Sequence, residues 1–319
     1  MHIPDGFLDA KTALATGALS AAGLGFALRQ VRLELPPRRV PLLGLAAAFL
    51  FAAQMINFPV LGGTSGHLMG GALVAALLGP AAAVVVVATV LLVQCFLFAD
   101  GGVLALGANI FNLGLVATGG GYTVYRLVAR CLPGLQGRAA ALAFSGWCST
   151  VLAATACAGE LAWSGTVVWR VVWPAMAGVH AFIGLGEGMV SALVFLAIAR
   201  TRPDLLPDAA PPKAAAARRR EWVVLGLLTS LGLALLVAPF ACPWPDGLEA
   251  VAARLGFAHQ ASAAPLAAPA AGYALPGVAS PGLATALAGA AGVLLVFGLA
   301  VAFSRLAVAK PAPSASDPA

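Results

Sequence analysis

The chain alternates between apolar runs long enough to cross a bilayer as helices and short segments rich in Gly, Pro and charged residues. This pattern predicts nine helical spans, at residues 12–28, 42–57, 65–78, 81–98, 103–127, 139–158, 172–198, 222–240 and 283–303. The third and fourth runs could form one helix, but Gly79-Pro80 between them is a strong break signal. Because the third run is short and Gly-rich at its start, we expect it to stop short of the full bilayer depth.

The composition of the chain supports this assignment. Of the 319 residues, 61% are hydrophobic and 9% are charged, whereas a soluble globular domain carries roughly 25% charged residues. So few polar side chains cannot cover a water-exposed surface. The sequence therefore predicts an all-α polytopic bundle in the lipid bilayer. The net charge of +6 relates to the orientation of the spans and does not indicate a nucleic-acid partner.

The positions of the basic residues predict how the chain is oriented. Nine spans with the N-terminus outside place all but three of the 18 Lys and Arg residues on the cytoplasmic side, leaving Lys11, Arg170 and Arg254 outside. Merging the third and fourth runs would move three more arginines outside, so the nine-span topology is preferred. The first residues include acidic side chains instead of the basic start of a signal peptide, so we expect Met1 and His2 to remain on the mature protein.

Changes in composition divide the chain into four parts. Residues 1–202 form the seven-span part, and residues 203–221 form a cytoplasmic linker that is rich in Pro, Ala and Arg. Residues 222–304 form a two-span module whose two helices are joined by a long loop outside the membrane. Residues 305–319 are expected to be a disordered tail.

Two of the four histidines, His2 and His67, lie on the outer side in this topology. The N-terminal amine, the backbone nitrogen of residue 2 and the imidazole Nδ1 of His2 can close two chelate rings on one metal ion. His67, which follows a Gly-rich loop, could fill the fourth position in the plane. A square-planar nitrogen site suits Ni²⁺ or Cu²⁺.

Each of these histidines also has an ordinary explanation. A His at position two is usually part of a solvated terminus. A lone His after a Gly-rich loop is usually a hydrogen-bonded structural residue. The residues alone therefore support a metal site and a structural role about equally.

A resemblance to a known family changes this balance. Six segments resemble, in order, the CbiM/NikM family, the substrate-binding components of energy-coupling-factor importers for cobalt and nickel. They are MHIPDGFL from Met1, FAAQMINFP from Phe51, GGTSGHL from Gly62, QCFLFADGG from Gln94, LGAN from Leu106, and His180-Ala181 with GLGE from Gly184. The resemblance covers the first ~200 residues.

The family's metal ligands carry over onto Met1, through its amine, onto His2, through its amide nitrogen and imidazole, and onto the imidazole of His67. The resemblance implies a separate transmembrane (T) component and ABC-type ATPase subunits as partners. It also implies a bacterial or archaeal plasma membrane, with the metal site on the extracytoplasmic side. The chain has no G-x-x-x-x-G-K-[ST] loop of its own. No resident cofactor is expected, because Ni²⁺ or Co²⁺ is the transported substrate.

The C-terminal module has a resemblance of its own. Trp244–Glu249, with the sequence WPDGLE, resembles the PDGLE segment of the two-span accessory subunit of these systems. This resemblance implies a natural fusion of the binding component with its accessory subunit. The alternative is an ordinary Pro-Asp-Gly turn.

Several other polar residues could orient the ligating imidazoles or form structural hydrogen bonds. Asp5 could accept a hydrogen bond from the His2 ring or cap the first helix. His180 and Glu187 are seven residues apart and share a helical face, so they could form a relay for the ion or a structural pair. The remaining candidates are Gln54, Asn57, Ser65, Gln94, Asn109 and Asn112.

These observations predict the metal-capture component of an ATP-driven importer that prefers Ni²⁺ over Co²⁺, and not an enzyme. The alternatives are cobalt uptake for cobalamin synthesis and, from another class, an ion-coupled secondary transporter that uses Glu187 and His180. A membrane metalloenzyme that activates water at an open metal position is a further alternative.

Overall fold

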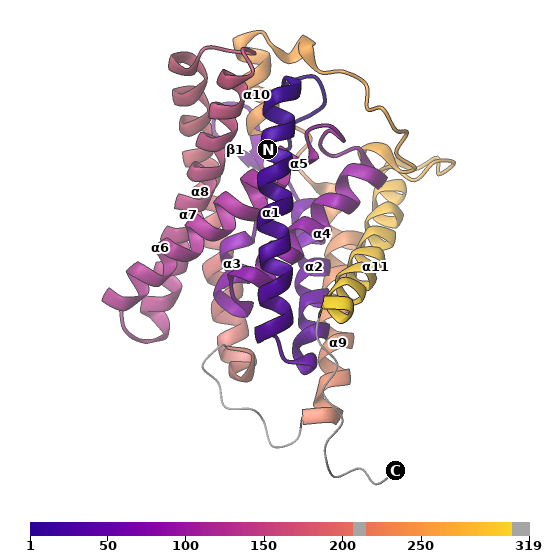
Figure 1. Ribbon diagram of the computed structural model, residues 1–319. Helices are drawn as coiled ribbons and strands as arrows, with labels where there is room; N and C mark the ends of the chain where they lie inside the picture. The colour runs from indigo at the N-terminus through magenta and orange to yellow at the C-terminus, as the bar shows by residue number, and fades with distance from the viewer. Residues whose placement is uncertain (207–214, 308–319) are drawn as a thin grey trace, which may run out of the picture.

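The computed structural model describes residues 1–206 and 215–307 and consists largely of helices (Figure 1). The α-helices are α1 (Ala10–Glu34), α2 (Val40–Gln54), α3 (Gly71–Leu78), α4 (Pro80–Phe98), α5 (Leu106–Asn109), α6 (Thr118–Cys131), α7 (Gly134–Trp163), α8 (Trp169–Thr201), α9 (Ala215–Gly232), α10 (Gly247–Leu255) and α11 (Pro281–Ala307). A π-helical segment, η2 (Ile110–Ala117), joins α5 to α6, and α9 continues through η4 (Leu233–Val237) and η5 (Ala238–Phe240). Two short strands, β1 (Phe58–Val60) and β2 (Thr64–Gly66), form an antiparallel hairpin.

Five helices in the described part of the chain are long and apolar enough to cross a membrane: α4, α7, α8, α11 and the helix from Glu221 to Phe240. The α1–α2 pair also qualifies when it is taken together, with a bend of 116° between its two helices. The chain is therefore an all-α polytopic membrane protein. The remaining expected spans fall on shorter helical pieces, α3 and the α5–η2–α6 run, so the count of nine and the orientation stay predictions.

The C-terminal boundaries differ from those expected. Helix α9 begins at Ala215, inside the predicted linker, because the Ala-Arg run there consists of good helix formers. Helix α11 continues to Ala307, past the start of the predicted tail. The middle of the predicted linker, 207–214, and most of the predicted tail, 308–319, lie outside the described residues.

The expected third span is divided into a hairpin and a short helix. Gly62 and Gly63, with φ angles of 84° and 71°, make the turn between β1 and β2. Helix α3 then has only eight residues, about 12 Å of helix at 1.5 Å per residue. It ends as expected at Gly79-Pro80, where α4 begins. His67 therefore lies in irregular backbone between the hairpin and α3, not inside a span.

The two-helix module packs directly on the seven-helix part. Helices α9 and α11 both contact α2, where Gly292 of α11 approaches the ring of Phe51. The loop between them, residues 241–280, crosses the end of the bundle that holds the N-terminus, and α10 within this loop packs on α8 (Figure 1). We call this the site end, defined by Met1, His67 and Asp246.

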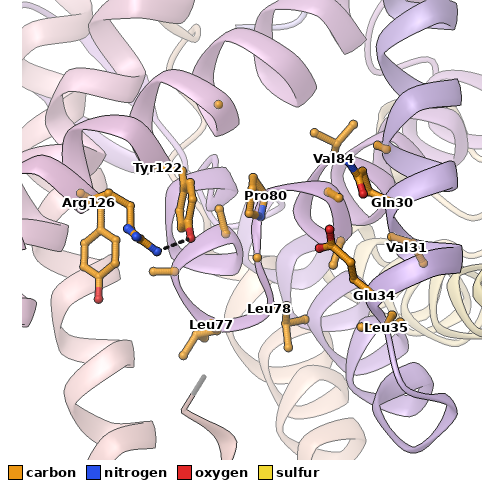
Figure 2. Close-up of a pocket in the computed structure, with 18 of the residues that line it drawn as sticks. Gln30, Val31, Glu34, Leu35, Leu77, Leu78, Pro80, Val84, Tyr122 and Arg126 are labelled. Carbon is orange, nitrogen blue, oxygen red and sulfur yellow. Dashed lines mark hydrogen bonds between the residues drawn. The ribbon is translucent and has the colours of Figure 1, made fainter. Parts of the chain in front are cut away.

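The opposite end of the bundle is open. A groove of about 960 Å³ lies between α1, the α3–α4 junction and α6. Figure 2 shows Gln30 and Glu34 of α1 facing the groove, with Pro80 between them and the hydrogen-bonded pair Tyr122–Arg126. Arginines also line it, so we call this the basic end, defined by Arg39, Arg126, Arg130 and Arg138.

Candidate metal centre

The segment before α1 enters the bundle with alternate side chains buried. Met1, Ile3 and Phe7 are buried. The amide nitrogen of Ile3 donates to Oδ1 of Asn109 at 2.7 Å, and Nδ2 of Asn109 donates to the Ile3 carbonyl at 3.1 Å. The amide of Gly102 donates to the same carbonyl at 2.8 Å. The expected supporting residue Asn109 therefore fixes the backbone directly after His2.

Asp5 takes neither of its two expected roles. Its carboxylate accepts hydrogen bonds from the amides of Val103 at 3.0 Å and Leu104 at 2.7 Å. The cap of α1 is Asp9, whose side chain accepts from the Thr12 amide. Asp5 thus connects the N-terminal segment to the loop after α4 through these two amides. The His2 ring contacts Asp100 instead.

The structure brings together the three residues expected to bind metal. The Met1 amine lies 3.3 Å from Nε2 of His67. The rings of His2 and His67 are stacked, with centroids 5.5 Å apart and an interplanar angle of 8°. Nε2 of His2 is buried without a hydrogen-bond partner among the described residues. The chain terminus and a loop 66 residues away thus place their nitrogen donors side by side.

Two carboxylates hold these donors. Asp246 forms an ion pair with the Met1 amine through Oδ2 at 2.7 Å. Its other oxygen, Oδ1, accepts from the amide of Glu249 and so caps α10, and Glu249 bonds back to the Asp246 amide. Asp100 contacts Nδ1 of His2 at 2.7 Å, and the Tyr273 hydroxyl donates to Asp100 at 2.5 Å.

Burial and charge set the protonation states of these groups. Burial alone would lower the pKa of the Met1 amine, but the charge of Asp246 and its hydrogen bond outweigh burial and raise it. Burial, followed by the positive charges of the amine and His2, lowers the pKa of His67 to about 3. Burial would raise the pKa values of Asp100 and Asp246, yet His2 and the amine hold them well below their usual range. His67 is therefore neutral near pH 7, with a lone pair available to a metal ion.

The C-terminal loop and the His67 hairpin are joined by hydrogen bonds. The amide of Ser65 donates to the Pro245 carbonyl at 2.8 Å, and its hydroxyl donates to the Trp244 carbonyl at 2.8 Å. The hydroxyl of Thr64 donates to the Pro245 carbonyl at 3.0 Å. The expected supporting residue Ser65 therefore acts by fixing the PDGLE turn against the hairpin.

The backbone just after His67 is held from two sides. Glu187 accepts hydrogen bonds from the amides of Met69 at 2.5 Å and Gly70 at 2.9 Å. On the other side, Gln54 donates to the Met69 carbonyl at 3.2 Å, and Gln94 donates to Gln54 at 2.8 Å. Glu187, Gln54 and Gln94 thus position the His67 loop without touching its ring.

The remaining candidates have separate partners. Asn112 donates to Glu160 at 2.7 Å, which makes a helix-to-helix contact between η2 and α7. Asn57 contributes its backbone carbonyl, which accepts from the Cys242 amide. His180 does not pair with Glu187 in the structure, because its Nδ1 contacts the Met176 carbonyl at 2.8 Å.

The space among these residues suits one small ion. A cavity of about 10 Å³, which matches a single water-sized guest, is lined by Met1, His67, Thr150, His180 and Asp246. If each metal–nitrogen bond is roughly 2.0 Å, donors at neighbouring corners of a square lie roughly 2.8 Å apart. The observed 3.3 Å between the Met1 amine and His67 Nε2 is close to that spacing.

Three residues at the site, Asp100, Asp246 and Tyr273, were not among the candidates from the sequence. Asp100 and Asp246 do lie on predicted outer loops, inside segments that resemble the family. The spacing Asp246-x-x-Glu249 is also a helix-start signature, which would have predicted α10. Tyr273 gave no comparable signal.

Comparison with known proteins agrees with this architecture. Residues 2–205 match the CbiM family, described as the cobalt uptake substrate-specific transmembrane region, and residues 220–309 match the PDGLE domain. A NikMN relative from Archaeoglobus fulgidus is 38% identical over 96% of this chain and 99% of its own length. The fused nickel transport protein NikMN of Rhodobacter capsulatus is 34% identical over 87% of this chain and 84% of its own length.

Cobalt transporters and solved structures are similar as well. The cobalt transport protein CbiM of Geobacter sulfurreducens is 30% identical over 81% of this chain and 78% of its own length. A crystal structure of a truncated transition metal transporter matches 63% of this chain and 99% of that chain, at 32% identity and a TM-score of 0.58. The chain therefore belongs to the CbiM/NikM family of nickel and cobalt transport proteins, and it carries a PDGLE accessory subunit fused at its C-terminus.

Proposed function

We propose that this chain captures Ni²⁺, and less readily Co²⁺, outside the cell as the substrate-binding component of an ATP-driven energy-coupling-factor importer. The ligands are the Met1 amine, the amide nitrogen and imidazole of His2, and the imidazole of His67. The chain supplies no ATPase, so a transmembrane partner and ABC-type ATPase subunits drive transport across the plasma membrane. The observation that carries this proposal is the meeting of three groups: the Met1 amine and His67 Nε2, which lie 3.3 Å apart and border one ion-sized cavity, and the His2 ring, which is stacked on the ring of His67.

Binding exchanges the two carboxylate contacts for the ion. The amine leaves Asp246 and gives up a proton, because only the neutral amine has a lone pair. Nδ1 of His2 leaves Asp100 and gives up the proton that it shares with that carboxylate, so that the ring carries its one proton on Nε2. The His2 amide also loses its proton, Nδ1 and the amide nitrogen close the chelate ring, and neutral His67 completes the plane. Asp100 and Asp246 remain beside the ion, where they position its ligands and balance its charge.

The preference for nickel rests on the amide ligand. A backbone amide must lose its proton to bind a metal, and the resulting planar nitrogen set favours a square-planar ion such as Ni²⁺. Co²⁺ accepts the same donors in a less regular geometry, so cobalt uptake for cobalamin synthesis is the second candidate function. The relatives named for nickel and for cobalt support both ions as substrates.

Two functions from other classes have less support. An ion-coupled secondary transporter would use Glu187 as an ion site, but that carboxylate is occupied by two backbone amides. A metalloenzyme would need an open metal position, whereas His67 is placed to fill the fourth one.

The experiment that tests the proposal blocks the amine. We expect the full chain, purified from cells grown with both ions, to contain close to one nickel ion per molecule. A Gly-Ser extension before Met1 should abolish this content, while the same extension at the C-terminus should preserve it. His67→Ala should behave like the N-terminal extension, and His259→Ala should behave like the wild type, because His259 is exposed on the loop.

Full nickel content in the N-terminally extended protein would contradict the amine ligand. Uptake into vesicles that contain the chain alone, without nucleotide and partner subunits, would contradict the ATP-driven mechanism. Cobalt in excess of nickel would reverse the proposed preference.

A further inference from the structure

His180 presents a buried nitrogen that no other part of the site uses. Its Nδ1 contacts the Met176 carbonyl at 2.8 Å, so Nδ1 carries the proton and Nε2 keeps a free lone pair. The side chain is 1% exposed, and Nε2 has no hydrogen-bond partner among the described residues. Buried imidazole nitrogens are almost always paired, so this one needs an explanation.

His180 borders the same small cavity as Met1 and His67. Helix α8 begins at the site end, and Ile183, one turn beyond His180, contacts Gly66 of the hairpin. His180 therefore lies nearer than the His67 loop to the end from which an external ion arrives.

The PDGLE turn covers this nitrogen. A Cβ atom on Gly247 would lie 2.7 Å from both Nε2 and Cε1 of His180, so only glycine allows this close approach. Asp246, the preceding residue, binds the Met1 amine. When the amine leaves Asp246 to bind metal, the turn over His180 loses one of its contacts and keeps the hydrogen bonds that Thr64 and Ser65 donate to its backbone.

We propose that His180 Nε2 is a transient ligand, which receives the incoming metal ion beneath the Asp246-Gly247 turn and passes it to Met1, His2 and His67. The inference rests on the proposed function, since it needs that site as the destination. In the first step a water leaves the ion as its bond to Nε2 forms. In the second step the amine gives up its proton to solvent, the bond to Nε2 breaks, and the bonds to the amine and His67 form, so the ion passes from one nitrogen ligand to the next.

A transient ligand has a kinetic signature that a permanent ligand lacks. It lowers the barrier for loading and for release equally, because both directions pass through the same intermediate. Its removal therefore slows both rates and leaves their ratio, the dissociation constant, unchanged. Removing a permanent ligand or a structural contact weakens equilibrium binding instead.

The test measures Ni²⁺ loading of the metal-free full chain by stopped-flow, release to a chelator, and equilibrium affinity by titration. For His180→Phe we expect both rates to fall by about tenfold or more with an unchanged dissociation constant. Gly247→Ala keeps the imidazole but covers Nε2, and it should slow the same two rates. His259→Ala, an exposed histidine of the same loop, should leave both rates at the wild-type value.

Unchanged rates in His180→Phe would overturn the inference, and so would a weaker equilibrium affinity with faster release. These results differ from a failure of the proposed function. In that case the wild-type chain itself would not bind Ni²⁺, or its binding would not depend on His67.

Discussion

The two ends of the bundle differ in how their polar groups are arranged. At the site end, groups from the N-terminus, the hairpin and the C-terminal loop bond to one another beside a cavity of about 10 Å³. At the basic end, a groove of about 960 Å³ separates the helices, and the Arg126–Tyr122 contact is exposed. At the site end, many hydrogen bonds and ion pairs thus fix the geometry. At the basic end, the side chains around the groove are held by fewer such contacts among the described residues.

This difference indicates which end of the bundle can hold a metal ligand in a fixed position. A ligand set has to be held to within a fraction of an ångström, and rotatable side chains at an open groove are not held in this way. Substitutions at the site end should therefore change metal binding, while similar substitutions at the basic end should not.

The largest effect is expected from Gly102→Ala. A Cβ at this position would overlap the amide and the carboxylate of Asp5, so the N-terminal segment would have to move, at a cost of about 1–3 kcal/mol. We expect nickel affinity to fall by about 100-fold, because the move displaces Met1 and His2, which supply three of the four proposed donor atoms. The matched control is Gly119→Ala, which lines the groove with no atom within 4 Å of the added Cβ. Equal affinities of the two variants in a nickel titration would remove the distinction between the ends.

A smaller effect is expected from Asp100→Asn. The amide cannot hold Nδ1 of His2 with a full negative charge, so nickel affinity should fall by about 10–100-fold. Asp204→Asn, which removes the partner of Arg202 at the other end, is the control and should bind nickel like the wild type. A drop of similar size in both variants would point to general destabilisation.

The pH dependence of binding should change in Asp246→Asn. In the wild type, protons compete with nickel for the Met1 amine, whose pKa is raised by Asp246, so affinity should still increase as the pH rises above 8.0. Without that charge, burial lowers the amine pKa, so the pH midpoint of binding should shift down. Glu249→Gln removes a weaker contribution and should shift it less. Titrations across pH test the sign, and an upward shift would contradict this assignment.

The smallest effect is expected from Tyr122→Phe. It removes an exposed hydrogen bond of 3.4 Å to Arg126, so the free energy of unfolding should change by less than about 0.5 kcal/mol. Nickel affinity should stay the same. A measurable loss of affinity would connect the groove to the metal centre and weaken the contrast between the two ends.

Most of the fold could be predicted from the sequence, because apolar runs and breakers act locally. Gly79-Pro80 marked the boundary between α3 and α4 correctly. The third run stops short of the full bilayer depth, as expected, because its first residues belong to β2 and to irregular backbone that ends at the left-handed Gly70. Hydropathy does not distinguish a buried hairpin from a helix of equal apolarity.

The site could be predicted only in part. The chelating chemistry of an N-terminal amine next to His2 follows from consecutive residues. His67 was a candidate from its position on the predicted outer side, and the family resemblance favoured the ligand role over a structural one. The partners Asp100 and Asp246 depend on how distant loops meet, which no local pattern encodes. For Asp5 the sequence suggested a contact that the structure does not contain. Asp5 is close to His2 in sequence, but its carboxylate accepts hydrogen bonds from the loop after α4.

The ion pair between Met1 and Asp246 has a consequence for charge balance. In the proposed site, an ammonium of charge +1 is replaced by a dication together with an amidate of charge −1, which again sum to +1. Asp246, which pairs with the ammonium, therefore faces the same total charge before and after these two groups bind the ion. The amine and the amide release one proton each for every ion, so a weakly buffered solution should become more acidic as ions are captured.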